Sequence, residues 1–308
     1  MSLRVIAPGP LATVQDLGRS GYREFGVPIS GAFDRESMAM ANAILGNDDD
    51  AAAIELTSFG GVFEAMQPMA LAIAGATMAS RIERPFGSAF NLSVPQSFSL
   101  ETHDHLILGR ASQGQRAYLA VRGGWLTPVV LASRSSDRSL RIGDIMSAES
   151  STTPVRRPSV EWIRTILDEP FRYLDGPDAS RLKSEPLDSH TFRVAPLSDR
   201  VGIRLEGALI ALRDAPKRLS SPVCPGTIQV AGHSPIVLGP DCGTMGGYPH
   251  VGQVISADLD RLGQLRPGDS VRFCRVDLVE ARALDLASRI RLDECGLILK
   301  TAAGWVPK

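Results

Sequence analysis

Short apolar runs recur along the whole chain, and glycine or proline separates most of them. Many runs are rich in β-branched residues, which favour the extended backbone of a strand. Short runs between turn residues are typical of a sandwich or barrel, so the pattern predicts a mainly β protein. The expected strands are Leu3–Ile6, Ala70–Ala74, His105–Leu108, Ala117–Val121, Thr191–Val194, Ile228–Val230, Pro235–Leu238, Gln253–Ala257 and Ser270–Val276.

Helical spacing of apolar residues is rarer. Arg35–Leu45 follows Asp34, a good N-cap residue, and ends before Gly46, and these end signals predict a helix. Ser159–Leu167 is a second expected helix.

A third helix is expected near the C-terminus. Val276, Val279, Ala283, Leu286 and Ile290 form an apolar stripe with steps of three and four residues. This spacing predicts a helix docked on a core. The alternative is a helix that binds a partner.

The chain length of 308 residues fits two domains or one large one. Ser150–Pro158 is polar and contains prolines, so it reads as a linker. We therefore expect a first domain at 1–150, a linker at 151–168, and a second domain with a C-terminal helix and tail at 169–308.

Two short motifs occur in the same order on both sides of this linker, which favours a duplicated β domain. The pattern R-x-G-x-R-x-x-G is found at Arg19–Gly26 and Arg200–Gly207, and L-R-x-G-D at Leu140–Asp144 and Leu265–Asp269.

Charge and composition narrow the function classes. The formal net charge of −1 disfavours a nucleic-acid binder, and no apolar run approaches the roughly 20 residues of a membrane-spanning helix. The four cysteines contain no C-x-x-C pair, so neither a zinc site nor a disulfide framework is expected. Without a signal-peptide pattern at the N-terminus, we expect a cytoplasmic protein.

The first candidate cluster lies in Thr13–Gly21, where Gln15, Asp16, Gly18 and Arg19 stand close together. Arg19 could contact a carboxylate or phosphate in two hydrogen bonds, aided by backbone N–H groups near the glycines. Alternatively, Asp16 and Arg19 brace a turn.

The second cluster is Ser30-Gly31, just before the expected helix at Arg35. A helix N-terminus favours an anion. Asp34 reads as an N-cap. The polar stretch Ser133–Asp137 could also hold an anion or be a solvated loop.

The third cluster is Leu238–His250, whose glycine content exceeds the need of a hairpin. It places polar groups on a loop between two strands, where binding groups often lie, although a structural turn remains the alternative. His250 could be a general acid or base. The polar residues of the loop are Asp241, Thr244, Tyr248 and His250.

Taken together, these clusters resemble the biotin-dependent carboxyltransferase family, which includes allophanate hydrolase subunit 2, the carboxyltransferase region of urea carboxylase and the C subunit of 5-oxoprolinase. The similar stretches are 13–34 (TVQDLGRSGYREFGVPISGAFD), 41–47 (ANAILGN), 53–61 (AIELTSFGG), 116–124 (RAYLAVRGG), 198–207 (SDRVGIRLEG), 225–238 (PGTIQVAGHSPIVL) and the segments GGYPHVGQVISADL and QLRPGD within 246–269.

The resemblance implies two tandem cyclophilin-like β-barrel domains with few helices. It also implies partners, namely a related cyclophilin-like subunit and a lactam-utilisation subunit. The implied activity is that of a hydrolase subunit in an ATP-dependent complex that cleaves a small amide or lactam, such as 5-oxoproline to L-glutamate. ATP would act at the level of the complex.

Other family members imply two alternatives. One is a biotin-dependent urea-type carboxyltransferase, with biotin carried by a partner. The other is a regulatory protein that antagonises a histidine-kinase inhibitor subunit.

The resemblance also implies site residues, none of them a metal ligand. The expected catalytic residues are Gln15, Asp16, Arg19, Asp241, Tyr248 and His250. The expected substrate-binding residues are Gly18, Ser30, Gly31, Arg200, Arg204, Gln229, Thr244, Gly246 and Gly247.

This sequence departs from the family in the third cluster, where members commonly read D-R-Q-T-T-G-G-Y-P-K. Here Cys242, Gly243, Met245 and His250 replace an arginine, a glutamine, a threonine and a lysine. Losing the cation and the amide removes charge-assisted contacts of about 1.5–3 kcal/mol each. The change suggests an altered site or another substrate.

Overall fold

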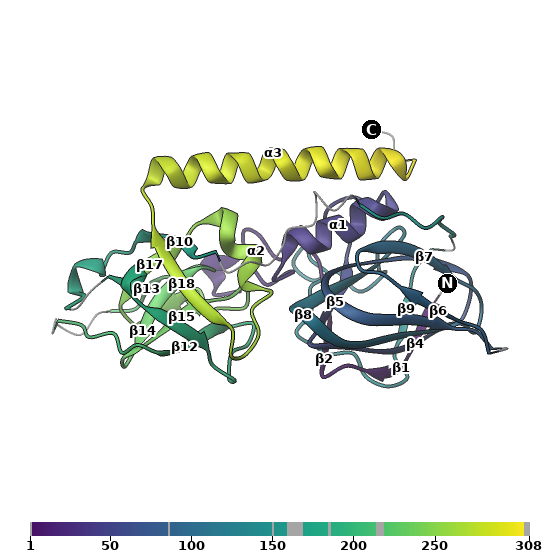
Figure 1. Ribbon diagram of the computed structural model, residues 1–308, viewed down its shortest axis with the longest axis horizontal. Coiled ribbons are helices and arrows are strands. Elements are labelled where there is room, and N and C mark those ends of the chain that lie inside the picture. Colours follow the sequence, from purple (N-terminus) through teal and green to yellow (C-terminus); the bar gives the residue numbers. More distant parts are fainter. Residues whose placement is uncertain are drawn as a thin grey trace. The chain divides into compact units, whose positions relative to one another are not determined.

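A computed structural model describes residues 2–85, 87–149, 151–158, 169–183, 186–213 and 219–304 (Figure 1). The chain forms two compact units. Unit 1 consists of Met1–Gly18, Asp34–Thr165 and Leu292–Lys308, and unit 2 of Arg19–Phe33 and Ile166–Arg291. Each unit therefore contains residues from distant parts of the chain. The boundaries expected at 150 and 168 stay a prediction, and 159–168 lies outside the described residues.

Unit 1 is built on one sheet with the strand order β2-β3-β8-β4-β1-β9, and β5 joins it by pairing with β6, β7 and β8. Alternate residues face a core that contains Leu3, Val5, Ile54 and Leu56. The strands are β1 (Ser2–Pro8), β2 (Leu11–Gln15), β3 (Ala53–Thr57), β4 (Phe59–Ala65), β5 (Met69–Glu83), β6 (Ala89–Leu92), β7 (Gln96–Leu100), β8 (His105–Val121) and β9 (Ile145–Ser147).

Unit 2 is a closed barrel with the order β10-β17-β14-β15-β12-β11-β18, closed by parallel pairing of β10 with β18. Its core includes Tyr173, Phe192 and Phe273, whose rings pack edge to face. The strands are β10 (Phe171–Asp175), β11 (Thr191–Val194), β12 (Gly202–Gly207), β14 (Thr227–Ala231), β15 (Ser234–Leu238), β17 (His250–Val254) and β18 (Ser270–Arg275), beside the small ribbon β13 (Ser221–Pro222) and β16 (Met245–Gly246).

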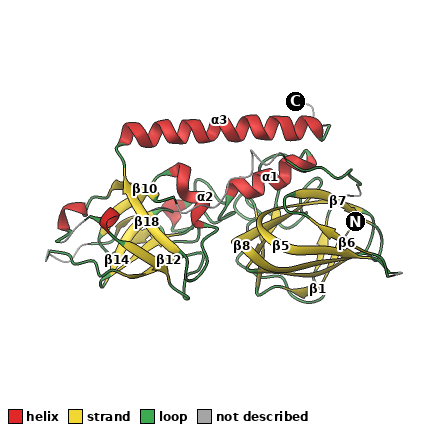
Figure 2. Cartoon of the chain, in the orientation of Figure 1, coloured by secondary structure: helices red, strands yellow, loops and turns green. Residues whose placement is uncertain are grey.

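The mainly β fold class with few helices is confirmed (Figure 2). Two strand predictions need correction. The runs at 105–108 and 117–121 belong to one long strand, β8. The run at 253–257 ends as a strand at Val254, because Ser256–Asp258 turns into a 3-10 helix.

Asp258, the last residue of that 3-10 helix, anchors it to β10. Its buried carboxylate receives hydrogen bonds from the backbone and guanidinium of Arg172 and forms an ion pair with Arg261. Burial alone would raise the pKa of Asp258, but these donors hold it below its ordinary value.

Helix α1 spans Arg35–Leu45, as predicted. Asp34 accepts a hydrogen bond from the Ser37 amide at 2.9 Å, and Gly46 ends the helix in the left-handed conformation. The other helices are α2 (Leu259–Leu262), α3 (Leu278–Ala302) and the 3-10 turns Arg23–Phe25, Ala179–Arg181 and Leu187–Ser189. The expected helix at 159–167 lies outside the described residues. No described helix is long and apolar enough to cross a membrane.

The prediction that the C-terminal stripe docks on a core is wrong for most of its residues. Val276 is buried, but Val279, Leu286 and Ile290 are 78%, 59% and 49% exposed. The opposite face of α3 packs instead, with Ala281 buried in a cluster that includes Ile255, Ala257 and Val276. Leu284 of the same face is partly buried and packs against this cluster, so the helix uses the face opposite the stripe.

The repeated L-R-x-G-D motif forms the same turn in both units. In unit 1 the Arg141 amide donates to Asp144 at 2.9 Å, and in unit 2 the Arg266 amide donates to Asp269 at 2.8 Å. Each turn leads into a final strand, β9 or β18.

The central glycines of these turns also correspond. Gly143 donates to Val5 of β1 and Gly268 to Val194 of β11, both at 2.8 Å. Their φ angles are +86° and +90°. The R-x-G-x-R-x-x-G pair is not equivalent, since 23–25 is a 3-10 turn and 202–207 is a strand.

We expect Gly143→Ala and Gly268→Ala to lower the free energy of unfolding by similar amounts, about 1–2 kcal/mol each. A Cβ at either position meets no heavy atom within 4 Å, so left-handed strain is the main cost. Gly296→Ala is the matched control, because this open helical position should gain about 0.5–1 kcal/mol. Urea denaturation measures all three, and unequal losses at the two turns would contradict their equivalence.

Candidate functional site

Asp16 holds a loop of unit 1 in place. One oxygen, Oδ1, accepts from the hydroxyls of Ser133 and Ser135 at 2.6 Å and from the Gly18 amide at 2.8 Å. The other, Oδ2, accepts from the Arg134 amide at 2.5 Å. Burial would raise the pKa of Asp16, but these donors outweigh it and keep the pKa below its ordinary value. The geometry therefore favours a bracing role over proton transfer.

The loop that Asp16 holds is strained. Leu131 and Ala132 have φ angles of 53° and 59°, a left-handed conformation that costs side-chain-bearing residues energy. Surrounding contacts must hold such a conformation. Asp16 accepts hydrogen bonds from residues 133–135, which directly follow the strained pair, and from Gly18 in its own turn.

Gln15 presents one partnered and one unpartnered end of its side-chain amide. Its Nε2 donates to the Ser136 carbonyl and the Thr13 hydroxyl, both at 2.9 Å. Since a carbonyl only accepts, this contact fixes which end of the amide is nitrogen. The Oε1 atom is buried and has no hydrogen-bond partner among the described residues. A buried acceptor without a partner costs about 1–3 kcal/mol, so a hydrogen-bond donor placed at Oε1 would stabilise this site.

One face of the unit 1 sheet carries buried polar residues. Strand register places Thr13, Glu55 and Tyr118 side by side, with Thr57 and Arg116 as the next pair. All five are at most 9% exposed. Because side chains alternate along a strand, their neighbours in β2, β3 and β8 fill the apolar core on the other face.

A chain of contacts links this face to the start of α1. The Asp34 amide donates to the Tyr118 oxygen at 2.8 Å, and the Tyr118 hydroxyl donates to Glu55 Oε2 at 2.7 Å. Arg116 Nε lies 3.4 Å from Glu55 Oε1. Burial, with the negative charges of Glu55 and Asp34, raises the pKa of Tyr118 well above its usual value. The phenol therefore stays a donor.

The sequence patterns did not single out Glu55, Arg116 and Tyr118 as candidates. They stand in two stretches that served only as family markers and strands, 53–61 and 116–124. The available signal was a charged residue, Glu55, between apolar residues of a strand that is buried on both faces.

Unit 2 has its own cluster, centred on Arg200. The guanidinium binds Asp241 in two hydrogen bonds, Nε to Oδ2 at 2.6 Å and Nη2 to Oδ1 at 3.1 Å. Nη2 also donates to the Gly31 carbonyl at 2.7 Å, and the Asp241 amide donates to the Arg200 carbonyl at 3.1 Å. Arg200 is 7% exposed. The pair acts as a clamp on two loops.

The segment 19–33 is one of these loops. The Arg19 amide donates to the Ile29 carbonyl at 2.7 Å and closes the loop, and the Ser30 amide donates to the Pro240 carbonyl at 3.0 Å. Ser30 and Gly31 both have left-handed φ angles, 56° and 83°. The structure thus brings Ser30, Gly31, Arg200 and Asp241 together from three distant parts of the chain.

The Gln229 side chain contacts the backbone of the glycine-rich loop 238–250. Its Nε2 donates to the Tyr248 carbonyl at 3.2 Å. A Cβ at Gly246 would lie 2.5 Å from this Nε2, so a side chain there would displace the Gln229 amide from its contact with Tyr248. The Tyr248 side chain is half exposed. Gly246 also pairs with Ser221 in the β13–β16 ribbon.

For Thr244 and His250, the contacts described next involve backbone atoms. The Thr244 carbonyl accepts from the Val223 amide, and the His250 amide donates to Asp178 Oδ2 at 2.8 Å. Gly247 and Arg204 are exposed.

Cys242 stands where the family has a cation. Its thiol is buried, and burial raises its pKa to about 11. The position therefore holds a neutral group.

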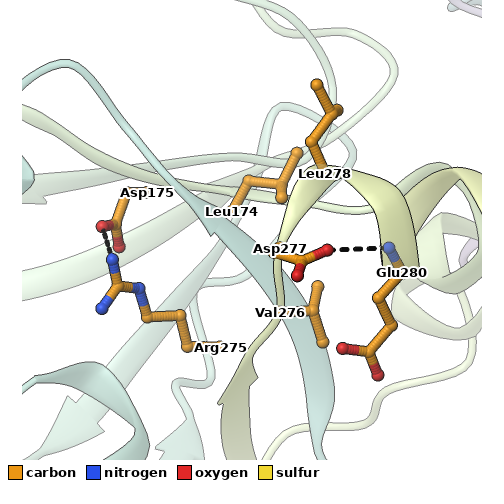
Figure 3. A pocket seen from close by; sticks show the side chains of 7 residues that line it. All are labelled: Leu174, Asp175, Arg275, Val276, Asp277, Leu278 and Glu280. Atoms are coloured by element: carbon orange, nitrogen blue, oxygen red, sulfur yellow. Dashed lines mark hydrogen bonds and ion pairs between the residues drawn. The ribbon is translucent and has the colours of Figure 1, made fainter.

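Each unit has an open cavity of about 570 Å³. In unit 2 the cavity lies between β18 and the start of α3 (Figure 3). There Asp277 accepts from the Glu280 amide, and Arg275 pairs with Asp175. These charges already serve the helix cap and an ion pair.

The cavity of unit 1 is closer to the predicted chemistry. Arg134, whose amide binds Asp16, lines it together with Asn47 and Arg122. Among the residues that the structure describes, no three His, Cys, Asp or Glu side chains are grouped to hold a metal ion.

Comparisons with known proteins agree with the fold. The family model described as "Carboxyltransferase domain, subdomain A and B" matches residues 25–275. The C subunit of 5-oxoprolinase from Haemophilus influenzae is 30% identical over 296 residues, which cover 92% of this chain and 94% of that protein. The Escherichia coli protein of the same name is 31% identical over 293 residues, covering 91% and 93%.

A solved structure, the urea amidolyase of K. lactis, superposes with a TM-score of 0.86 at 26% identity. The match covers 96% of this chain but 20% of that protein, so the chain spans about a fifth of its length. The resemblance stated from the sequence is confirmed. The roles of individual site residues stay predictions.

We expect Asp16→Asn to destabilise the protein by about 2–4 kcal/mol at pH 7, because buried donors lose a charged acceptor. The folded pKa of Asp16 is lowered, so its contribution is present above the ordinary pKa of about 3.9 and is lost as pH falls through the folded value. The difference between wild type and variant, from urea denaturation, should shrink below about pH 4. Asp137→Asn, at an exposed position of the same loop, is the control and should show no such dependence.

We expect Tyr118→Phe to cost about 1.5–3 kcal/mol, because Glu55 and the Asp34 amide lose a buried partner. Tyr248→Phe removes a hydroxyl from a half-exposed ring and should change stability by less than about 0.5 kcal/mol. Equal losses in thermal unfolding would show that the buried chain of contacts contributes nothing.

Proposed function

Because this chain belongs to the carboxyltransferase subdomain A and B family, we propose that it is a subunit of an ATP-dependent complex that opens a small lactam. The substrate that fits best is 5-oxoproline, with L-glutamate as product. The observation that carries the proposal is the match to the C subunit of 5-oxoprolinase, which runs over more than nine-tenths of both chains.

The site geometry is compatible with amide chemistry. A lactam presents an N–H donor and a carbonyl acceptor, and Gln15 Oε1 is a buried acceptor without a partner among the described residues. We assign substrate contact to Gln15. Asp16 and the Arg200–Asp241 pair serve as positioning groups, since their hydrogen bonds hold loops.

Arg19, Tyr248 and His250 keep the catalytic roles expected from the family pattern. The substrate-binding roles of the glycines and of Arg204, Gln229 and Thr244 stay part of the same proposal. Gln229 and Gly246 act by shaping the loop, as their close contact indicates.

We assign ATP to the complex rather than to a cradle on this chain. Arg200, a buried guanidinium of unit 2, already binds a carboxylate in two hydrogen bonds and a carbonyl with the same side chain. It therefore does not fit an ATP phosphate. The proposed partners are a related cyclophilin-like subunit and a lactam-utilisation subunit in the cytoplasm.

A second candidate is a carboxyltransferase that takes its carboxyl group from biotin on a partner. The likeness to the K. lactis urea amidolyase supports it. A regulatory role is the third, and the replacement of a family cation by the neutral, buried Cys242 supports a site altered from that of the enzymes.

The test is co-purification with the two partner subunits, followed by measurement of glutamate released from 5-oxoproline with ATP. We expect turnover only with all subunits present. A folded, complete complex that releases no glutamate overturns the proposal, and transfer from carboxybiotin to urea would then support the second candidate.

Arg19→Ala in this complex should lower kcat/KM at least about a hundredfold if its charge contacts substrate, with little change in the melting temperature. Arg193→Ala is the control, as an exposed arginine of β11. A large stability loss with activity retained per folded molecule would assign Arg19 to the turn.

A further inference from the structure

Helix α3 presents an apolar stripe to solvent. Its members are Val279, Ala283, Leu286, Ile290 and Leu297, all exposed. Steps of four and three residues separate the first four, and Leu297 follows Ile290 by seven, so the stripe has the spacing of a helix–helix seam. Figure 1 shows α3 as one uninterrupted helix. Exposed apolar residues in a continuous row mark an interaction site more often than scattered ones do.

The opposite face of the helix is already used. Ala281 is buried against the barrel of unit 2, in a cluster with Ile255, Ala257 and Val276. The stripe therefore lies on the face of the helix opposite the one that packs on unit 2.

Charges along the two edges of the stripe have opposite signs. Glu280 and Glu294 follow one edge, whereas Arg282 and Arg289 follow the other. All four are exposed. Arg289 also forms a 2.9 Å ion pair with Asp285 of the same helix, at an exposed position where such a pair contributes little. Asp293 occupies the seam itself, at the step between Ile290 and Leu297.

This pattern disfavours a second copy of the same helix. In an antiparallel pair like edges meet, so arginines would face arginines and glutamates would face glutamates. In a parallel pair Asp293 would meet its own copy inside the seam. Desolvating two carboxylates there outweighs an exposed ion pair between Arg289 and Glu294.

We propose that α3 docks an amphipathic helix of a different subunit. That helix carries an apolar stripe, a basic residue opposite Asp293, basic residues along the edge that meets Glu280 and Glu294, and acidic residues along the edge that meets Arg282 and Arg289. The inference rests on the proposed function in one respect, because it takes the docked helix from a subunit of the lactam-opening complex.

The experiment measures binding of the purified related cyclophilin-like subunit to this full chain. The double variant L286E/I290E places two charges in the seam and should weaken Kd about a hundredfold or more. The control L209E adds a charge at another exposed leucine of unit 2 and should leave Kd unchanged. Melting curves check that each variant is folded.

The variant R282E/R289E tests the charged edge without touching the stripe. It should weaken Kd about tenfold and make binding less dependent on salt. This variant also keeps the proposal testable if L286E/I290E fails to fold.

Three outcomes would overturn the proposal. One is a Kd unaffected by either double variant, and another is no binding by the wild-type chain at micromolar concentrations. The third is an isolated chain that is dimeric by light scattering and becomes monomeric in L286E/I290E, since the occupant is then a second copy. Failure of the proposed function looks different: the complex assembles through α3 but releases no glutamate.

Discussion

A buried carboxylate stays ionised only if hydrogen-bond donors or cations replace the water that it has lost. This constraint shapes both units. Asp16, Glu55 and Asp258 are all buried, and each joins segments far apart in the sequence. Asp16 binds a loop more than a hundred residues away, and Asp258 joins β10 to the turn before α2. The strained backbone near the candidate sites is tolerated because such charges hold it.

The same constraint separates the two kinds of residue in the candidate sites. A charged group whose hydrogen bonds are all made within the protein fixes the position of the backbone around it, as the Arg200–Asp241 pair does. A polar atom left incomplete, such as Gln15 Oε1, is where a ligand can gain most.

Local signals in the sequence predicted local structure well. The caps Asp34 and Gly46 placed α1 at its observed ends, and Thr191–Val194 is a strand at those residues. Long-range facts were beyond reach. No local pattern shows that Gly31 accepts from Arg200, because that contact depends on how residues 169 positions apart meet.

Errors also had physical reasons. The stripe at 276–290 has the spacing of a docked helix, but this spacing does not show which of two apolar faces of a helix packs. In α3 the packed face is the one that carries Ala281 and Leu284. The buried polar face escaped notice because its residues alternate with core residues and read as ordinary strands.

Segment 19–33 belongs to unit 2, although the residues before and after it belong to unit 1. Severing the chain at the polar stretch 151–158 would therefore not yield two self-sufficient halves. The C-terminal fragment would lack the Gly31 carbonyl that Arg200 binds and the Ser30 amide that holds Pro240. It would also lack Phe33, which packs in the barrel core. Gene fission in this region, or expression of one barrel alone, has to carry this short insert along, for example by grafting it onto the second half.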